Sequence, residues 1–149
     1  MKDKPALDDI TAWARLVRAS NHVLGQIEAE LKSAGFPPLS WYDVLLEIRR
    51  ADERTLRPSD IQDRILLAQY NVSRLIDRLE GGGFVAKRKS ADDGRSVLVT
   101  ITDDGEALLQ RMWPVYEAAI KRHFSDKLSG QKAAALAELL AGLLPDRSV

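Results

Sequence analysis

The sequence "NVSRLIDRLEGGGFVAKRKSADDGRSVLVTITDDG", residues 71–105, joins an amphipathic segment to a basic one. Apolar residues recur in its first part at i, i+3, i+4 and i+7: Val72, Leu75, Ile76 and Leu79. This spacing places them on one face of a helix. The three glycines at 81–83 suit a helix C-terminus, where a left-handed backbone is common. We therefore predict a helix that buries one face and ends at the glycines.

The opposite face of this helix is polar. It carries amide, hydroxyl and charged side chains: Gln69, Tyr70, Asn71, Ser73, Arg74, Asp77 and Arg78. Upstream, Pro58 follows Arg57 at the first turn of a short predicted helix. Two short helices joined by a tight turn, the second with a polar outer face, are the layout of a helix-turn-helix. A face that is merely solvated is the alternative interpretation of the polar residues.

The residues after the glycines predict a two-stranded antiparallel hairpin. Strands are expected at 84–89 and 96–101, and Asp93-Gly94 between them is a strong turn pair. A helix-turn-helix followed by such a hairpin is a winged helix. Its second helix would enter the major groove of DNA, and its wing would follow the backbone with the tip near the minor groove.

The charges of the hairpin fit that interpretation. Lys87, Arg88 and Lys89 are expected to neutralise phosphates. Asp93 is expected to pair with Arg95 and to hold the direction of its guanidinium. A solvated hairpin with an incidental ion pair is the alternative. The predicted DNA-binding residues are Arg57, Gln69, Asn71, Ser73, Arg74, Arg78, Lys87, Arg88, Lys89, Asp93 and Arg95.

Helices are also expected on both sides of this region. The segment 9–34 is apolar on two sides, which suggests burial by a partner subunit. Ser40 is predicted to cap the next helix, with Asp43 in the capping-box position. Thr102 is predicted to cap a long helix, and Ser129 the last one.

Composition limits the remaining possibilities. The chain has 149 residues, enough for a single domain, and 45% of them are hydrophobic. It contains no cysteine, which excludes disulfides, thiolate metal sites and thiol redox sensing. Net charge is zero, but residues 54–95 carry nine Lys/Arg and six Asp/Glu, a local excess of +3. No apolar run approaches the roughly 18 residues of a membrane span, so a cytoplasmic location is expected.

At residues 71–105 the chain resembles the MarR-type winged-helix transcription regulators. Asp93 and Arg95 occupy the positions of that family's acid-x-Arg wing, and Thr102 and Gly105 those of the entry to its fifth helix. The resemblance implies a mainly helical fold with a β-hairpin wing, dimerisation helices at 9–34 and 103–145, and a DNA-binding region at 40–101. It also implies a homodimer that binds a pseudo-palindromic operator, is typically a repressor, and releases DNA when a small ligand binds.

The same resemblance implies an effector site between the first, second and fifth helices. The residues available there are Trp13, His22, Phe36, Trp41, Tyr42 and Met112, which would suit an apolar or aromatic molecule. Ordinary core packing is the alternative for these side chains. Gln69-Tyr70-Asn71 is bulkier than the small hydroxyl residues common at this place in the family, which leaves the operator sequence open.

Enzymatic and metal-binding functions are not expected. The two histidines, His22 and His123, lie in opposite terminal helices with no nucleophile motif between them. We predict no cofactor and no metal site; a metal or ligand site at His22 and His123 is the alternative interpretation of these histidines. The alternative to a DNA-binding regulator is a winged helix that is used only for contacts with other proteins.

Overall fold

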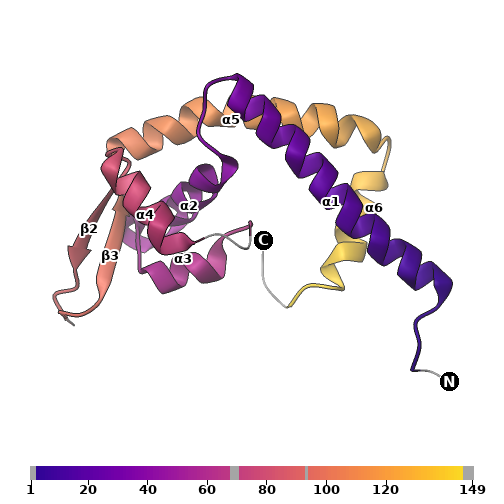
Figure 1. Ribbon diagram of the computed structural model, residues 1–149, viewed down its shortest axis with the longest axis horizontal. Helices are drawn as coiled ribbons and strands as arrows, with labels where there is room; N and C mark the ends of the chain where they lie inside the picture. The colour runs from indigo at the N-terminus through magenta and orange to yellow at the C-terminus, as the bar shows by residue number, and fades with distance from the viewer. Residues whose placement is uncertain (1–2, 68–70, 93, 146–149) are drawn as a thin grey trace. The chain divides into compact units, whose positions relative to one another are not determined.

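The computed structural model describes residues 3–67, 71–92 and 94–145 (Figure 1). The α-helices are α1 (Leu7–Ser33), α2 (Leu39–Arg50), α3 (Pro58–Arg64), α4 (Val72–Gly81), α5 (Asp103–His123) and α6 (Lys132–Ala141). The strands are β1 (Thr55–Leu56), β2 (Val85–Lys89) and β3 (Val97–Ile101), and two short 3-10 turns lie at Asp52–Arg54 and Ser125–Lys127. The predicted fold class, mainly helical with a small hairpin wing, is confirmed.

The chain divides into two units. Residues 31–115 form the winged unit, which contains α2 to β3 and the first part of α5. Residues 1–30 and 116–149 form the terminal unit, which contains most of α1, the end of α5, and α6. Each unit is described by itself below.

The winged unit is built on a three-stranded antiparallel sheet with the order β1-β3-β2. The predicted hairpin pairs Lys87 with Val99 and Lys89 with Val97. The third strand, β1, was not expected, because two residues are too short for a period to be recognised. It pairs Thr55 with Thr100, and their hydroxyl oxygens lie 2.8 Å apart.

Helices cover this sheet and supply the core. α2 packs against β3 and α3, and α4 packs against α3 and β2, as the grouping beside the hairpin in Figure 1 shows. The inner face predicted for α4 is buried, with Leu79 fully enclosed. Its C-terminus is followed by Gly83 at φ +81°, the left-handed conformation expected of the glycines. The DNA-facing helix of the prediction is therefore held by its apolar side.

Two of the predicted caps are wrong. α2 begins at Leu39, because Pro38 at φ −56° and ψ 154° supplies the extended residue before the first turn. Ser40 thus lies inside the helix, and no side chain in the described part of the chain caps it. α6 begins after Gln131 rather than Ser129, because Gly130 at φ +65° still turns the chain.

The cap predicted at the start of α5 is confirmed. The Gly105 amide donates to Thr102 Oγ1 at 3.1 Å, and the same hydroxyl donates to the Gly83 carbonyl oxygen at 2.6 Å. The Thr102 amide donates to the carbonyl oxygen of Phe84 at 3.1 Å. These bonds join the start of α5 to the entrance of β2.

The terminal unit leaves much apolar surface open. In α1, Ile10, Trp13 and Val17 are exposed, and Trp13 keeps 67% of its surface. In and after α6, Leu139, Leu143 and Leu144 are exposed as well. Among the residues that the structure describes, no helix combines the length and the apolar character that crossing a bilayer requires.

Candidate nucleic-acid interface

The outer face of α4 is the central element of the candidate site. Ser73, Arg74 and Arg78 are exposed on it, while the apolar residues of the same helix are buried. Asn71 is the N-cap residue before the helix, and its side-chain oxygen accepts a hydrogen bond from the Arg74 amide at 3.0 Å. Asn71 was predicted to contact DNA, and the structure shows that its side chain also caps the helix.

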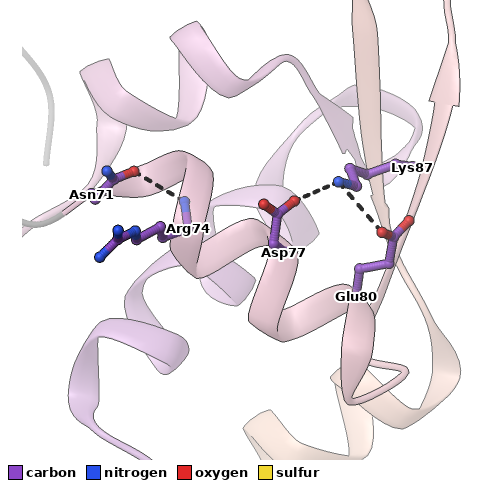
Figure 2. A network of polar contacts seen from close by, with 5 residues as sticks. All are labelled: Asn71, Arg74, Asp77, Glu80 and Lys87. Atoms are coloured by element: carbon purple, nitrogen blue, oxygen red, sulfur yellow. Dashed lines mark hydrogen bonds and ion pairs between the residues drawn. The ribbon is translucent and has the colours of Figure 1, made fainter.

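A second network joins α4 to the wing (Figure 2). Lys87 Nζ on β2 lies 2.6 Å from Asp77 Oδ1 and 3.4 Å from Glu80 Oε1, both on α4. The hydrogen bond to Asp77 raises the pKa of Lys87, and Glu80 acts in the same direction. Arg74 extends from the other end of the helix, away from this network.

This network changes the interpretation of Lys87. The sequence analysis assigned it to phosphate neutralisation, but its ammonium group already faces two carboxylates of its own chain. Asp77 and Glu80 are three residues apart and therefore share one side of α4. The spacing of the two acids is visible in the sequence, but only the packing of β2 on α4 brings Lys87 close to them.

The other cations of the wing are exposed. They are Arg88 and Lys89 on β2 and Arg95 in the turn. The turn is closed by the Ser90 amide, which donates to the Ser96 carbonyl oxygen at 2.8 Å. Asp93 lies outside the described residues, so its predicted pairing with Arg95 remains a prediction.

Two further predicted residues, Arg57 and Gln69, precede α4 in the sequence. Arg57 is exposed and occupies the N-cap position of α3, directly before Pro58. Gln69 lies outside the described residues. The structure thus gathers most of the predicted DNA-binding residues on α4 and the hairpin of one unit, with Arg57 at the start of α3.

The sequence analysis missed one residue beside the turn between α3 and α4. The side chain of Asp43, on α2, is buried with 6% of its surface exposed. Its Oδ1 accepts a hydrogen bond from the Leu66 amide at 2.8 Å, and its Oδ2 accepts one from the Leu67 amide at 2.7 Å. The sequence signal is an acid inside the apolar run "WYDVLLEI", where its spacing from Ser40 predicts a capping box instead.

The predicted effector residues fall in both units. Trp13 and His22 belong to the terminal unit and are exposed in the single chain. The other four belong to the winged unit, and Met112 is fully buried there. Tyr42 stacks on Trp113 with ring centroids 6.3 Å apart, and burial raises the pKa of its hydroxyl.

The remaining aromatic residues of this group also take part in packing. Trp41 meets Phe84 edge to face, with centroids 5.9 Å apart, and Phe36 is half-buried. In the terminal unit, the second histidine, His123, contacts Glu30 through Nε2, and Arg122 contacts the same carboxylate. These contacts lower the pKa of Glu30, with the hydrogen bond from Arg122 as the largest cause.

Comparisons with known proteins agree with this geometry. The model of the MarR family matches residues 34–96. An HTH-type transcriptional regulator of Bacillus cereus is 28% identical over 128 residues, which cover 86% of this chain and 83% of the relative.

Two solved structures share the fold. Sco3205, a MarR family transcriptional regulator from Streptomyces coelicolor in complex with DNA, has a TM-score of 0.81 at 21% identity, with 97% of this chain and 94% of that chain covered. BpsR of Bordetella bronchiseptica, whose DNA binding is regulated by 6-hydroxynicotinic acid, has a TM-score of 0.79 at 23% identity, with 97% and 100% covered. Over residues 34–96 this chain therefore matches the MarR family, and its relatives over most of its length are helix-turn-helix transcriptional regulators.

Proposed function

We propose that this regulator binds a specific double-stranded DNA operator as a homodimer, with α4 in the major groove and the β2–β3 hairpin along the backbone. The family that it matches is one of regulators and not of enzymes. The observation that carries the proposal is the exposed row Ser73, Arg74 and Arg78 on a helix whose opposite face is buried. Such a helix can present hydrogen-bonding side chains to base edges without disturbing its own core.

The charges of the site support the same conclusion. Asp77 and Glu80 lie on α4 and would repel phosphate, but both face the ammonium of Lys87. Arg74 and Arg78 on the helix and Arg88, Lys89 and Arg95 on the wing are exposed cations of the same unit. Lys87 therefore offsets one of the two negative charges of these acids within the chain, and the exposed cations can act on DNA.

A homodimer follows from the exposed apolar residues and from symmetry. The resemblance to the family assigns its dimer interface to the first, fifth and sixth helices. In this chain α1 and the region of α6 expose Trp13, Leu139 and Leu143, and burial against a second copy would remove them from water. Two symmetric α4 helices would then fit two major grooves one helical turn apart, on a pseudo-palindromic operator.

A small molecule is proposed to control operator binding, as it does in BpsR. Release of DNA on binding of an apolar or aromatic ligand would make the protein a ligand-responsive repressor. The absence of cysteine removes thiol oxidation as the trigger. Because its target is the genome, the protein is proposed to act in the cytoplasm.

The decisive experiment is selection of bound sequences from a random duplex pool with the full-length protein. An inverted repeat with half-sites about one helical turn apart is the expected result. If no sequence is enriched and affinity for random duplex does not fall as salt rises, the protein does not bind DNA through phosphates. That result would favour a winged helix used for protein contacts.

A further inference from the structure

We propose that Asp43 is a positioning residue for the DNA-reading helix: its carboxylate holds the backbone of the turn before α4 and thereby sets how α4 is presented to DNA. The inference rests on the proposed DNA binding, and it assigns a role to a residue of α2 that lies outside the predicted DNA-contacting surface.

The geometry of the contact is specific. Among the described residues, Leu66 and Leu67 donate their amide hydrogens to the two oxygens of the buried carboxylate, and these two donors are consecutive in the chain. Hydrogen bonds from amides to an ionised carboxylate are short and strong compared with neutral ones. Two such bonds to neighbouring peptides restrict the orientation of this backbone segment as well as its distance from α2.

Leu66 lies in a part of the turn where its side chain adds little packing. α3 ends at Arg64 and α4 begins at Val72, so Leu66 and Leu67 belong to neither helix. The side chain of Leu66 is 72% exposed and contributes little packing. The anchor of Leu66 is therefore its amide, which is part-buried and needs an acceptor.

An aspartate at position 43 is informative, because burying a carboxylate costs free energy. Asp43 itself is only 6% exposed, and a buried carboxylate is unfavourable unless hydrogen bonds compensate for its lost hydration. An apolar side chain there would serve the core of α2 but could not accept two amides. The hydrogen bonds from the Leu66 and Leu67 amides therefore explain why an acid occupies position 43.

A purely structural role and a positioning role make different predictions. Loss of a structural contact lowers global stability and leaves the folded molecule able to bind DNA. Loss of a positioning contact loosens the turn within a folded molecule, so that α4 must be ordered again at each encounter with DNA. Operator affinity then falls even at temperatures far below the unfolding transition, where the protein is still folded.

The test uses Asp43→Asn in the full-length protein. Asparagine is nearly isosteric but turns one of the two acceptors into a donor facing an amide. Hydrogen exchange of the Leu66 and Leu67 amides should accelerate by about tenfold or more, while exchange at Leu79 in the core of α4 stays unchanged. Affinity for the selected operator should fall by about tenfold or more.

Glu47→Gln is the matched control. It removes a carboxylate from the same helix, one turn further on, where the acid pairs with Arg50 instead of the turn. Its operator affinity and its exchange at Leu66 and Leu67 should match the wild type. Asp43→Glu provides a second variant with the charge retained but displaced by one methylene, and the same loss of affinity is expected.

The outcomes separate the two proposals. Wild-type affinity in both Asp43 variants would overturn the inference, as would an affinity loss with unchanged exchange at Leu66 and Leu67. If Asp43→Asn does not fold, the comparison of Asp43→Glu with Glu47→Gln decides in the same way. Failure of the wild type to bind any duplex would instead refute the proposed function.

Discussion

Arg74 shows how one residue obtains its role from its place on a helix. It lies two residues after Val72 and one before Leu75, both buried, so its own side chain must leave the opposite face. Its amide completes the cap with Asn71. The backbone of this residue therefore stabilises the helix while its guanidinium remains available for base edges.

We predict that Arg74→Ala abolishes operator discrimination without affecting the fold. A lost base contact should cost about 1–3 kcal/mol of binding free energy per site, whereas an exposed substitution changes stability by about 0.5 kcal/mol or less. The ratio of operator affinity to random-duplex affinity measures discrimination, and thermal unfolding measures stability. Arg111→Ala, at an exposed arginine of α5, is the control. Unchanged discrimination in Arg74→Ala would mean that α4 is not the reading helix.

Gly105 is constrained by its neighbours rather than by its own φ. A Cβ at this position would lie 2.3 Å from the carbonyl oxygen of Phe84 and 2.7 Å from Ile101 Cγ1. The first contact is with backbone, which cannot move aside without disturbing the bond from Thr102 to the same oxygen. This close approach explains physically why the entry to α5 requires glycine.

We predict that Gly105→Ala destabilises the fold by about 1–3 kcal/mol, because overpacking outweighs the gain of up to about 1 kcal/mol in helix propensity. Gly81→Ala is the matched control, since a Cβ there meets nothing within 4 Å, and it should be neutral or slightly stabilising. Urea unfolding of both variants provides the measurement. Equal stabilities would show that the start of α5 can shift to accept a side chain.

At the scale of elements, the wing is attached to α4 by charge as well as by packing. Lys87 on β2 reaches Asp77 and Glu80 on α4 (Figure 2). The Ser90 to Ser96 bond closes the other end of the hairpin. The hairpin and α4 are thus connected through Lys87, while Arg88 and Lys89 of the hairpin remain exposed.

A double-mutant cycle of Lys87→Gln and Asp77→Asn should show a coupling of about 0.2–1 kcal/mol in unfolding free energy at low salt, and less at high salt. The pKa of Lys87 is raised above its ordinary 10.5, so this coupling is fully present at neutral pH and is lost as the pH rises through the raised value. A coupling of zero at every salt concentration would mean that the pair does not connect the two elements.

The tip of the wing gives a second test at this scale. Arg95→Ala should weaken operator binding by about 1–3 kcal/mol per lost contact, reduce its salt dependence and leave thermal stability unchanged. If Asp93 orients Arg95, Asp93→Ala should lower the affinity for operator DNA or leave it unchanged. Tighter binding by Asp93→Ala at every salt concentration would show that this aspartate only repels phosphate.

At the scale of the whole molecule, the exposed apolar residues of the terminal unit indicate association. Trp13 exposes 67%, Leu139 73% and Leu143 70% of their surfaces in the single chain. The sequence analysis expected α1 to be buried on two sides, and Ile27 and Leu31 near its end are buried. The exposed residues toward its start are those that a second copy would cover.

We predict a homodimer at micromolar concentration, measured by sedimentation. Leu139→Glu should weaken it, because a carboxylate would then be buried without a partner, and Glu138→Gln should not. Truncation after Ser129 should leave the chain aggregated or unfolded, since it removes α6 entirely. A compact monomer of the wild type would contradict the dimer.

Most of the secondary structure could be predicted, because it depends on patterns within a few residues. The period of α4, the glycines after it, the turn pair of the wing and the Thr102 cap are all local signals, and the structure bears out each of those that it describes. The errors concern the start of helices. Pro38 and Gly130 decided where α2 and α6 begin, against the serines that the sequence favoured.

By itself the sequence determined the winged helix-turn-helix, its polar outer face and its basic hairpin, since periodicity and turn chemistry operate along the chain. Only the tertiary structure decided which residues that are distant in the sequence contact one another. Asp43 and the turn at Leu66 are separated by 23 residues, and Lys87 meets Asp77 only because β2 packs on α4. Charge patterns cannot distinguish a cation that faces DNA from one that faces its own chain, because both are exposed and basic until the fold places their partners.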